Sequence, residues 1–285
     1  MNRKSLHMVG VWILVQGGSA MKYAEFANKV AIVTGASRGI GRAVAEVLIE
    51  SGANVLLVSQ HAAALQETAR ALSLLGPGQA VAEACTIDGS EQTASMIVHA
   101  AVSLWGRLDY MVNAAGGARV ATVLGANWNN WHEDFDVKFW GYLALMRAAV
   151  PFMKRGGDGV VVNLVGVAGK DPNPQLAIAS AVNGALRAVT KALADEVSPD
   201  HIRLVNVNPG STETDLLQKM AESYAQIRHT AVDVVLDDMR RRGPLGRLPT
   251  ALDVANVVCF LLSDGAALVT GTSVDIDGGV HRGLA

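Results

Sequence analysis

The stretch that decides the fold is Val30-Ala31-Ile32-Val33-Thr34-Gly35-Ala36-Ser37-Arg38-Gly39-Ile40-Gly41. Its first five residues form an apolar run of the length and composition of a buried strand. The glycines that follow permit a tight turn, let the backbone approach a phosphate, and let a helix pack closely on the strand. The N-terminus of such a helix offers unpaired N–H groups to an anion. The stretch therefore predicts a strand, a phosphate-binding turn and a helix.

Short apolar runs alternate with longer helical patterns from this strand onward, which is typical of a parallel sheet built from βαβ units. The predicted strands are 30–34, 54–58, 80–87, 110–113, 160–164, 203–208 and 273–276. The predicted helices are 40–51, 62–75, 92–105, 131–154, 176–197 and 251–262. Right-handed crossovers then give an α/β fold with a doubly wound, seven-stranded parallel sheet in a single domain. In such a sheet the ligand crevice lies beyond the carboxyl ends of the strands.

The composition bounds the class of protein. Half of the 285 residues are hydrophobic and the formal net charge is −2, so no basic surface favours nucleic acid or an anionic membrane as a partner. A small-molecule site is favoured instead. Cys85 and Cys259 lie far apart and lack the spacing of a zinc site or a disulfide framework, which favours a reduced, cytoplasmic compartment and no bound metal.

The first twenty residues precede the α/β pattern. A basic start, an apolar run over 9–15 and small residues over 17–20 resemble a weak secretory signal, but the run is shorter than the about 20 residues that span a bilayer. The alternative is a disordered extension or an upstream start codon, because Met21 stands just before the first strand. We therefore treat 1–20 as an extension, disordered or not native, and assign 21–285 to the domain.

One long connection, 215–247, interrupts the regular alternation of strands and helices. Long ordered loops inside compact domains are usually functional. We therefore predict that this segment is a lid over the ligand crevice.

Four further landmarks follow the glycine-rich turn, whose spacing is T-G-x-x-x-G-x-G. They are Asp88 after the third strand, Asn113-Ala114-Ala115-Gly116 after the fourth, Asn208-Pro209-Gly210-Ser211-Thr212-Glu213-Thr214 after the sixth, and Asp277-Gly278-Gly279 after the seventh. Together they resemble the short-chain dehydrogenase/reductase (SDR) family over residues 28–280. The resemblance implies a Rossmann-like fold and NAD or NADP as cofactor. The alternative for the turn alone is a glycine turn that only packs.

The resemblance also implies which residues hold the cofactor. They are Gly35, Ser37, Arg38, Gly39, Ile40, Gly41, Ser59, Gln60, Asp88, Asn113, Ala114, Pro209, Gly210, Thr212 and Thr214. Asp88 would meet the adenine, and Asn113 would brace the sheet beside it. Thr214 and the Thr212 backbone would hold the nicotinamide carboxamide or phosphates. Two departures stand out, because Ala114 replaces the second Asn of N-N-A-G and the segment after Asp88 is about one residue short.

The choice between the two dinucleotides is usually read at the end of the second strand. Ser59-Gln60-His61 carries no carboxylate there, and Arg38 in the turn is available to a 2′-phosphate. We therefore expect a weak preference for NADP. The alternative is a solvated Arg38 with no role in the choice.

The catalytic positions of the family are replaced in this sequence. The family has a Ser at the end of the fifth strand, a Y-x-x-x-K pair at the start of the next helix, and an Asn on the preceding helix. In this sequence Gly166 stands at the Ser position and Ile178 at the Tyr position. Val182 stands at the Lys position and Lys138 at the Asn position. In the family the Tyr transfers the proton, the Ser binds the reacting oxygen, and the Lys lowers the Tyr pKa and binds the ribose. Loss of a positioned general acid typically costs about 10²–10⁴-fold in rate.

Other side chains near these positions are candidate replacements. Lys138 is the first candidate as a proton donor or ribose ligand, and its alternative is an exposed lysine on an amphipathic helix. Lys170 and Asp171 are weaker, because charged residues in a proline-containing loop are usually solvated. Asn183 is turned by about 100° from Val182 on the helix and is marginal.

Three functions stay open. The first is an SDR-family NAD(P)-binding oxidoreductase that acts on an apolar alcohol or ketone by an altered mechanism. The second is a catalytically inactive dinucleotide-binding sensor or partner subunit, and the third is a non-redox lyase or isomerase on the same scaffold. The alanine-rich helix 176–197 allows close packing across a subunit interface, so a homodimer or homotetramer is expected, with neither a nucleic-acid nor a membrane partner.

Overall fold

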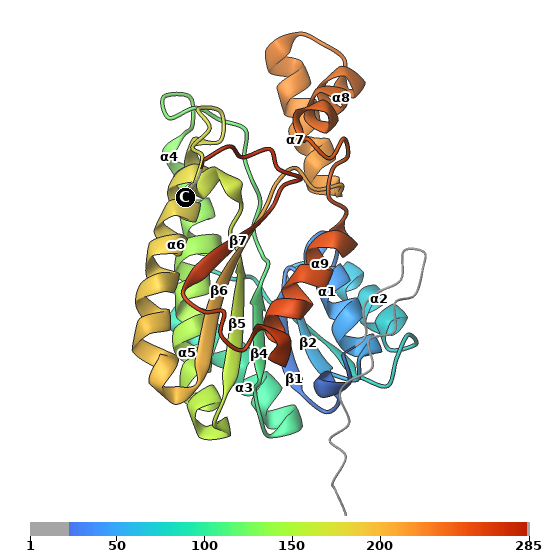
Figure 1. Cartoon of the computed structure of the whole chain (residues 1–285), viewed down its shortest axis with the longest axis vertical. Helices are drawn as coiled ribbons and strands as arrows, with labels where there is room; N and C mark the ends of the chain where they lie inside the picture. Colours follow the sequence, from blue (N-terminus) through green and yellow to red (C-terminus); the bar gives the residue numbers. More distant parts are fainter. Residues whose placement is uncertain (1–22, 284–285) are drawn as a thin grey trace, which may run out of the picture.

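A computed structural model of the chain describes residues 23–283, and the predicted extension 1–20 lies outside this range. Seven parallel strands form one sheet in the order β3-β2-β1-β4-β5-β6-β7, which confirms the predicted α/β class (Figure 1). The strands are β1 (Val30–Thr34), β2 (Asn54–Ser59), β3 (Ala80–Ala84), β4 (Tyr110–Asn113), β5 (Gly159–Leu164), β6 (Ile202–Pro209) and β7 (Thr272–Ile276). The strand order reverses between β1 and β4, and a crevice is expected at that switch point.

Helices cover both faces of the sheet (Figure 1). The longer helices are α1 (Gly39–Glu50), α2 (Ala62–Leu72), α3 (Glu91–Trp105), α4 (Trp128–Asp134), α5 (Gly141–Gly156), α6 (Ala177–Val197), α7 (Asp215–Arg228), α8 (Val232–Arg242) and α9 (Ala251–Leu262). Short helical turns are η1 (Ala24–Phe26), η3 (Val167–Gly169), η4 (Ser198–Asp200) and η5 (Asp264–Ala266), and η2 (Phe135–Trp140) is a π-helix. No helix within residues 23–283 is long and apolar enough to cross a membrane.

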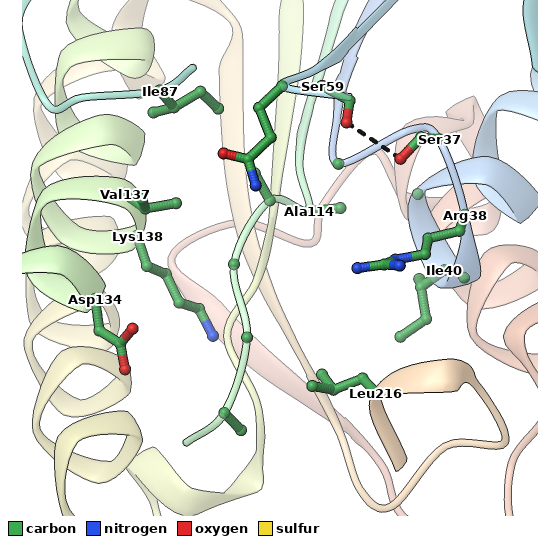
Figure 2. Close-up of a pocket in the computed structure, with 18 of the residues that line it drawn as sticks. Ser37, Arg38, Ile40, Ser59, Ile87, Ala114, Asp134, Val137, Lys138 and Leu216 are labelled. Atoms are coloured by element: carbon green, nitrogen blue, oxygen red, sulfur yellow. Dashed lines mark hydrogen bonds between the residues drawn. The ribbon is translucent and has the colours of Figure 1, made fainter. Parts of the chain in front are cut away.

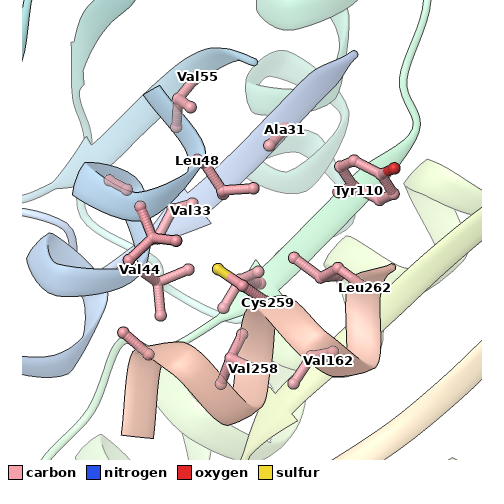
Figure 3. Packing of buried hydrophobic residues seen from close by; sticks show 14 of the residues in the cluster. Ala31, Val33, Val44, Leu48, Val55, Tyr110, Val162, Val258, Cys259 and Leu262 are labelled. Atoms are coloured by element: carbon pink, nitrogen blue, oxygen red, sulfur yellow. The ribbon is translucent and has the colours of Figure 1, made fainter. Parts of the chain in front are cut away.

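The central strands are apolar throughout because both of their faces are covered. In β1, Ala31 and Val33 pack against α1, α2 and α9, whereas Val30 and Ile32 pack against α3 and α5 on the opposite face. Successive side chains of a strand point to opposite faces, so a strand buried on both sides reads as one hydrophobic run. Figure 3 shows the first of these cores, in which Leu48 of α1 and Cys259 of α9 meet over the strands.

The predicted helix over 131–154 is three elements in the structure. An α-helix over Trp128–Asp134 leads into the π-helix η2, and α5 then begins at Gly141. Hydrophobic spacing does not separate an α-helix from a π-helix over one turn, so the sequence pattern reads as continuous. A π-turn within a helix is frequently found at a functional site.

The predicted lid is a helical hairpin rather than a long loop. Helices α7 and α8 occupy most of 215–247 and project beyond the body of the domain (Figure 1). They enclose a small apolar core of their own, in which Tyr224 of α7 and Val235 of α8 are buried. The spacing Val232, Val235, Leu236 and Met239 follows the i, i+3, i+4, i+7 rule and could have revealed α8.

Candidate functional site

A cavity of about 890 Å³ opens beyond the carboxyl ends of β1, β2 and β4, where the strand order reverses. It lies within the size range of small-molecule sites and at the place where doubly wound sheets bind ligands. Its walls come from the β1–α1 turn, the ends of β2 and β3, the loop after β4, η2, α6 and α7. The lining residues include Gly35, Ser37, Arg38, Gly39, Ile40, Gly41, Ser59, Gln60, Ile87, Ala114, Lys138, Ala179, Val182 and Thr214.

The β1–α1 turn has the shape of an anion cradle. A β-carbon at Gly35 would lie 2.7 Å from the carbonyl oxygen of Ala114, and one at Gly41 would lie 2.6 Å from that of Gly35. Both positions therefore exclude a side chain. Gly39 begins α1 at φ +59°, and a β-carbon there would meet only the Thr214 side chain, at 3.6 Å. The unpaired N–H groups of the first turn of α1 thus face the cavity and suit a pyrophosphate.

The end of β2 is polar and carries no acid. The Ser59 hydroxyl donates to the Ser37 hydroxyl at 3.1 Å, and the Thr68 hydroxyl donates to the Ser37 carbonyl at 3.1 Å. The Arg38 guanidinium extends into the cavity (Figure 2). This corner therefore presents hydroxyls, the Gln60 amide and one cation to the part of a ligand that lies beyond β2.

Asp88 does not reach the cavity. Its carboxylate accepts from the backbone N–H of Ser90 at 3.0 Å and from the Ser90 hydroxyl at 2.8 Å, and these bonds hold its pKa below the usual range. Ile87 lines the cavity in its place (Figure 2). The bonds to Ser90, which is the N-cap of α3, hold the Asp88 carboxylate at the start of that helix and away from the cavity wall. The lining of the cavity therefore gives the expected adenine contact of Asp88 no support.

Hydrogen bonds join the loop after β4 to the end of β1, just before the glycine-rich turn. Thr34 accepts at its hydroxyl from the N–H groups of Ala114 and Ala115, at 2.9 and 3.1 Å. Asn113 is fully buried, and its amide donates to Asn163 Oδ1 at 2.8 Å. Asn113 therefore braces β4 against β5, as expected, while Ala114 forms part of the wall.

The segment after β6 contributes one side chain to the cavity. Thr214 lines it and donates from its hydroxyl to the Thr212 carbonyl at 3.2 Å. Thr212 is buried and donates to the carbonyl of Gly210 at 3.0 Å. Pro209, Gly210 and Thr212 are not part of the wall, and hydrogen bonds link Thr214 to Thr212 and Thr212 to Gly210.

Two of the predicted catalytic positions lie away from the cavity. Ile178 is fully buried in an apolar cluster with Tyr142, Val165 and Leu186. Gly166 has a φ of +108°, and a β-carbon there would lie 3.1 Å from the side-chain nitrogen of Asn183. A serine at Gly166 would therefore be strained in this backbone conformation.

Two residues of α6, Ala179 and Val182, line the cavity. Ala179 lines the cavity, whereas Ile178 does not. The residue four places after Ala179 is Asn183, which is buried beside Gly166 with its side-chain oxygen lacking a partner in residues 23–283. Of the predicted pair, Val182 therefore lines the cavity and Ile178 does not; of the pair shifted by one residue, Ala179 lines it and Asn183 does not. Val182 stands at the border, buried and still in contact with the cavity.

Lys138 is the main functional candidate that sequence reasoning placed in the cavity. It extends from η2 across the cavity wall, and its ammonium donates to the Val165 carbonyl at 2.6 Å (Figure 2). A β-carbon at Gly116 would approach its stem to 3.3 Å. Desolvation lowers the pKa of Lys138 to about 8, and the charge of Asp134 opposes this shift. Lys138 is thus a shielded side chain of the cavity wall and not an exposed surface lysine.

A charged cluster beside Lys138 escaped sequence reasoning. Arg119, in the loop after β4, donates to Asp134 at 2.9 Å, to Asn130 at 2.9 Å and to Glu133 at 2.5 Å. The cluster joins that loop to α4, next to the cavity mouth. No short motif signals it, because the three acceptors meet Arg119 only through the fold.

The weaker candidates of the next loop lie elsewhere. Lys170 pairs with Asp275 of β7 at 3.0 Å, and neither lines the first cavity. Asp171 lies 3.7 Å from the His281 ring. The expectation that Lys170 is only solvated is therefore wrong, because it forms a partly buried ion pair. The residues from 23 to 283 contain no cluster of His, Cys, Asp and Glu that could hold a metal ion.

Comparisons with known proteins give a consistent result. The model of a family described as enoyl-(acyl carrier protein) reductase matches residues 35–281. Trans-4-hydroxycyclohexanecarboxylate dehydrogenase of Sinomonas cyclohexanicum is 32% identical over 90% of this chain and 94% of its own. The 3-oxoacyl-(acyl-carrier-protein) reductase FabG of Thermotoga maritima is 31% identical over 89% of this chain and 98% of its own.

Solved structures agree with this result. NAD⁺-bound xylitol dehydrogenase superposes with a TM-score of 0.85 at 26% identity, covering 90% of this chain and 100% of its own. L-sorbose reductase from Gluconobacter frateurii, complexed with NADPH and L-sorbose, gives a TM-score of 0.85 at 28% identity over 90% and 98% of the two chains. With the glycine-rich cradle at the switch point of the sheet, these matches show that the chain belongs to the short-chain dehydrogenase/reductase family of NAD(P)-dependent oxidoreductases.

Proposed function

We propose that this protein interconverts a hydroxyl and a carbonyl group on a small substrate with an apolar body, and that the Lys138 ammonium takes the place of the usual tyrosine. One observation carries the proposal: the Lys138 side chain enters the same cavity as the glycine-rich turn. NAD(P), when bound, supplies or accepts the hydride. The side chains of the cavity bind the substrate and transfer the proton.

The substrate region is proposed to lie between η2, α6 and the α7–α8 hairpin. Its wall is largely apolar, with Val120, Val137, Ala179, Val182, Leu216 and Met220. An apolar wall excludes water and favours a substrate that carries few polar groups beyond the reacting one. The hairpin is proposed to act as the lid over this region, because Leu216 and Met220 of α7 reach the cavity.

Lys138 is the polar group best placed to serve the reacting oxygen. Its ammonium has three N–H donors, of which the Val165 carbonyl takes one. Arg119 also lines the cavity, but three acceptors of α4 already occupy its guanidinium. A lysine with a pKa of about 8 holds a proton at neutral pH and releases it readily. In reduction Lys138 would donate this proton to the developing alkoxide, and in oxidation the neutral amine would accept it.

The relatives support the class of reaction proposed here. One is named as a dehydrogenase of a hydroxycyclohexane carboxylate, and a structural neighbour is a reductase complexed with NADPH and a ketose. Both names describe a hydroxyl and carbonyl pair. The carbon skeleton that this cavity accepts follows from its apolar wall, so we propose small cyclic or branched ketones and alcohols.

Replacement of Lys138 by methionine tests the proposal. We expect the variant to lose about 10²–10⁴-fold in turnover of a cyclic ketone panel with NADPH or NADH, because the proton donor is gone. Cofactor binding, followed by nicotinamide fluorescence, should stay unchanged. Lys219→Met is the matched control, because Lys219 also lines the cavity but lies on α7. Equal losses in the two variants would contradict the role of Lys138.

A dinucleotide sensor or partner subunit is the second candidate. The small side chains at Gly166 and Ala179 favour it, because neither can contact a substrate through a polar group. Tight cofactor binding without turnover by the unmodified protein would select this candidate. Assembly into a homodimer or homotetramer through α6, and a cytoplasmic location, are proposed for both candidates.

A further inference from the structure

A second cavity, of about 410 Å³, lies at the open edge of the sheet between α6 and β7. Figure 1 shows β7 as the last strand of the sheet, with α6 beside it. Among residues 23–283, none lines both this cavity and the one described above. The two are therefore separate sites, and the proposed function makes no use of the second.

The walls of the second cavity are strongly basic. Lys170, Arg187 and Lys191 supply three cations to the lining. Asp275 supplies the only carboxylate among the described lining residues, so the lining carries a net charge of +2. The whole chain has a formal net charge of −2. The positive charge is thus a local feature of this edge.

The nearby carboxylates leave part of this charge uncompensated. Asp275 accepts from the Lys170 ammonium at 3.0 Å and from the Asn208 amide at 2.7 Å, which engages both of its oxygens. Lys191 pairs with Asp195 one turn further along α6. Arg187 forms no ion pair or hydrogen bond with any residue in 23–283.

The geometry keeps the cations together. Arg187 and Lys191 are four residues apart on α6 and share one face, where like charges repel. Gly271 of the edge segment lets the Lys191 stem lie close, because a β-carbon there would meet its Cδ at 3.1 Å. Thr272 and Ser273 add hydroxyls, and Asn206 donates from its amide to the Ser273 hydroxyl at 3.4 Å. The Ser273 proton is then free to be donated.

We propose that this cavity binds a compact multivalent anion that carries phosphate or carboxylate groups. Arg187 would grip it with its planar pair of N–H donors, while Lys191 and Lys170 supply point charges and Ser273 supplies a neutral donor. Such an anion removes the repulsion between the cations. It comes either from solution, as a free phosphate compound, or from a carboxylate of a second copy of this chain at the sheet edge.

Calorimetric titration of the full chain with inorganic pyrophosphate tests the proposal, at fixed ionic strength and with and without saturating NADPH. We expect one binding event that persists in the presence of NADPH, since the glycine-rich turn is then filled. Arg187→Gln should weaken that event by about tenfold or more, because a charge-assisted pair of hydrogen bonds is lost. Arg70→Gln is the matched control, because Arg70 is exposed on α2 and lines neither cavity.

Light scattering on the same variants separates the two sources of the anion. Arg187-dependent binding of pyrophosphate with an unchanged molecular mass supports a free anion. A lower mass for Arg187→Gln alone, together with no pyrophosphate binding by the parent, assigns the cavity to a carboxylate of a second copy. Pyrophosphate binding that is equal in Arg187→Gln and Arg70→Gln, or that vanishes with NADPH, with no change in mass, would overturn the proposal.

Discussion

Two regions of the domain differ in how they can contact a ligand. One is the turn between β1 and α1, and the other is the segment from β5 to α6. The turn offers backbone N–H groups to an anion, and it requires glycine, since a β-carbon at Gly35 would lie 2.7 Å from the Ala114 carbonyl oxygen. In the β5–α6 segment, contact with a ligand depends on side chains. The residues at the positions in question are Gly166, Ala179 and the buried Asn183. A site made of backbone survives changes of side chains around it, whereas a site made of side chains does not.

The largest effect is expected for Gly39→Val, which tests the binding role of the turn. Gly39 has a φ of +59° and faces the open side of the cradle, so a branched side chain would strain the turn and fill the place of the pyrophosphate. We expect affinity for NADPH and NADH to fall by at least about a hundredfold in a fluorescence titration, about 2.7 kcal/mol.

Gly106→Val is the matched control for backbone strain. Gly106 ends α3 at φ +76° with no atom within 4 Å of a β-carbon position. It should lose stability but keep the parent affinity for NADPH. Equal affinities of Gly39→Val and the parent would show that the turn is only structural.

The rotation of α6 about its axis gives the next largest effect. Ile178→Tyr should lower the free energy of unfolding by about 1–3 kcal/mol, because the larger ring is forced into a fully packed cluster. Ala179→Tyr should cost less, since Ala179 faces the cavity. Urea denaturation of the two variants compares them directly.

The same rotation predicts where an activity can be rebuilt. The pair Ala179→Tyr and Asn183→Lys should raise ketone reduction above that of the parent, because the tyrosine would then stand at the cavity wall with a lysine one helical turn later. The pair Ile178→Tyr and Val182→Lys should not. The reverse outcome would favour the register expected from the sequence. Gly166 is left unchanged in both, because its φ of +108° disfavours serine.

The pH dependence of ketone reduction tests the role of Lys138 more finely. Its pKa of about 8 means that the proton-donating ammonium is present below that pH. We expect the rate to be flat below about pH 8 and to fall about tenfold per pH unit above it. A profile that shows no break near pH 8 would contradict the assignment.

The same group predicts the sign of a stability change. Lys138 has a folded pKa of about 8 and an ordinary value of 10.5, so the unfolded chain binds its proton more readily between these values. The free energy of unfolding should therefore rise with pH across this window, relative to Lys138→Met. Chemical denaturation of both proteins at pH 8 and pH 10 measures the difference.

The smallest effect concerns the choice of cofactor. Arg38→Gln should weaken the binding of NADPH by about fivefold or less, since a solvent-accessible charge pair contributes little to affinity. The binding of NADH should stay unchanged. We also expect the parent to bind NADPH at least as tightly as NADH, because the β2 end carries no acid. A tenfold advantage for NADH would contradict the weak preference for NADP.

Much of the cofactor side was predictable because its signals are local. The glycine spacing of the turn and the bracing role of Asn113 follow from residues within a few positions of each strand end. Asp88 is not part of the cavity wall, because its carboxylate accepts two hydrogen bonds from Ser90 at the start of α3. The hairpin α7–α8 was missed although its apolar residues follow a helical spacing.

By itself the sequence determined the sheet, its strand count and the position of the dinucleotide cradle. Strands buried on both faces must be apolar throughout, and only glycine fits where Gly35 and Gly41 meet backbone atoms at less than 3 Å. The tertiary structure alone decided which side chains face the cavity. Lys138 is shielded because η2, the loop after β4 and β5 converge on it. Ala179 rather than Ile178 meets the cavity because the packing of α6 on Tyr142 and Val165 sets its rotation, and a rotation about the helix axis leaves the hydrophobic period unchanged.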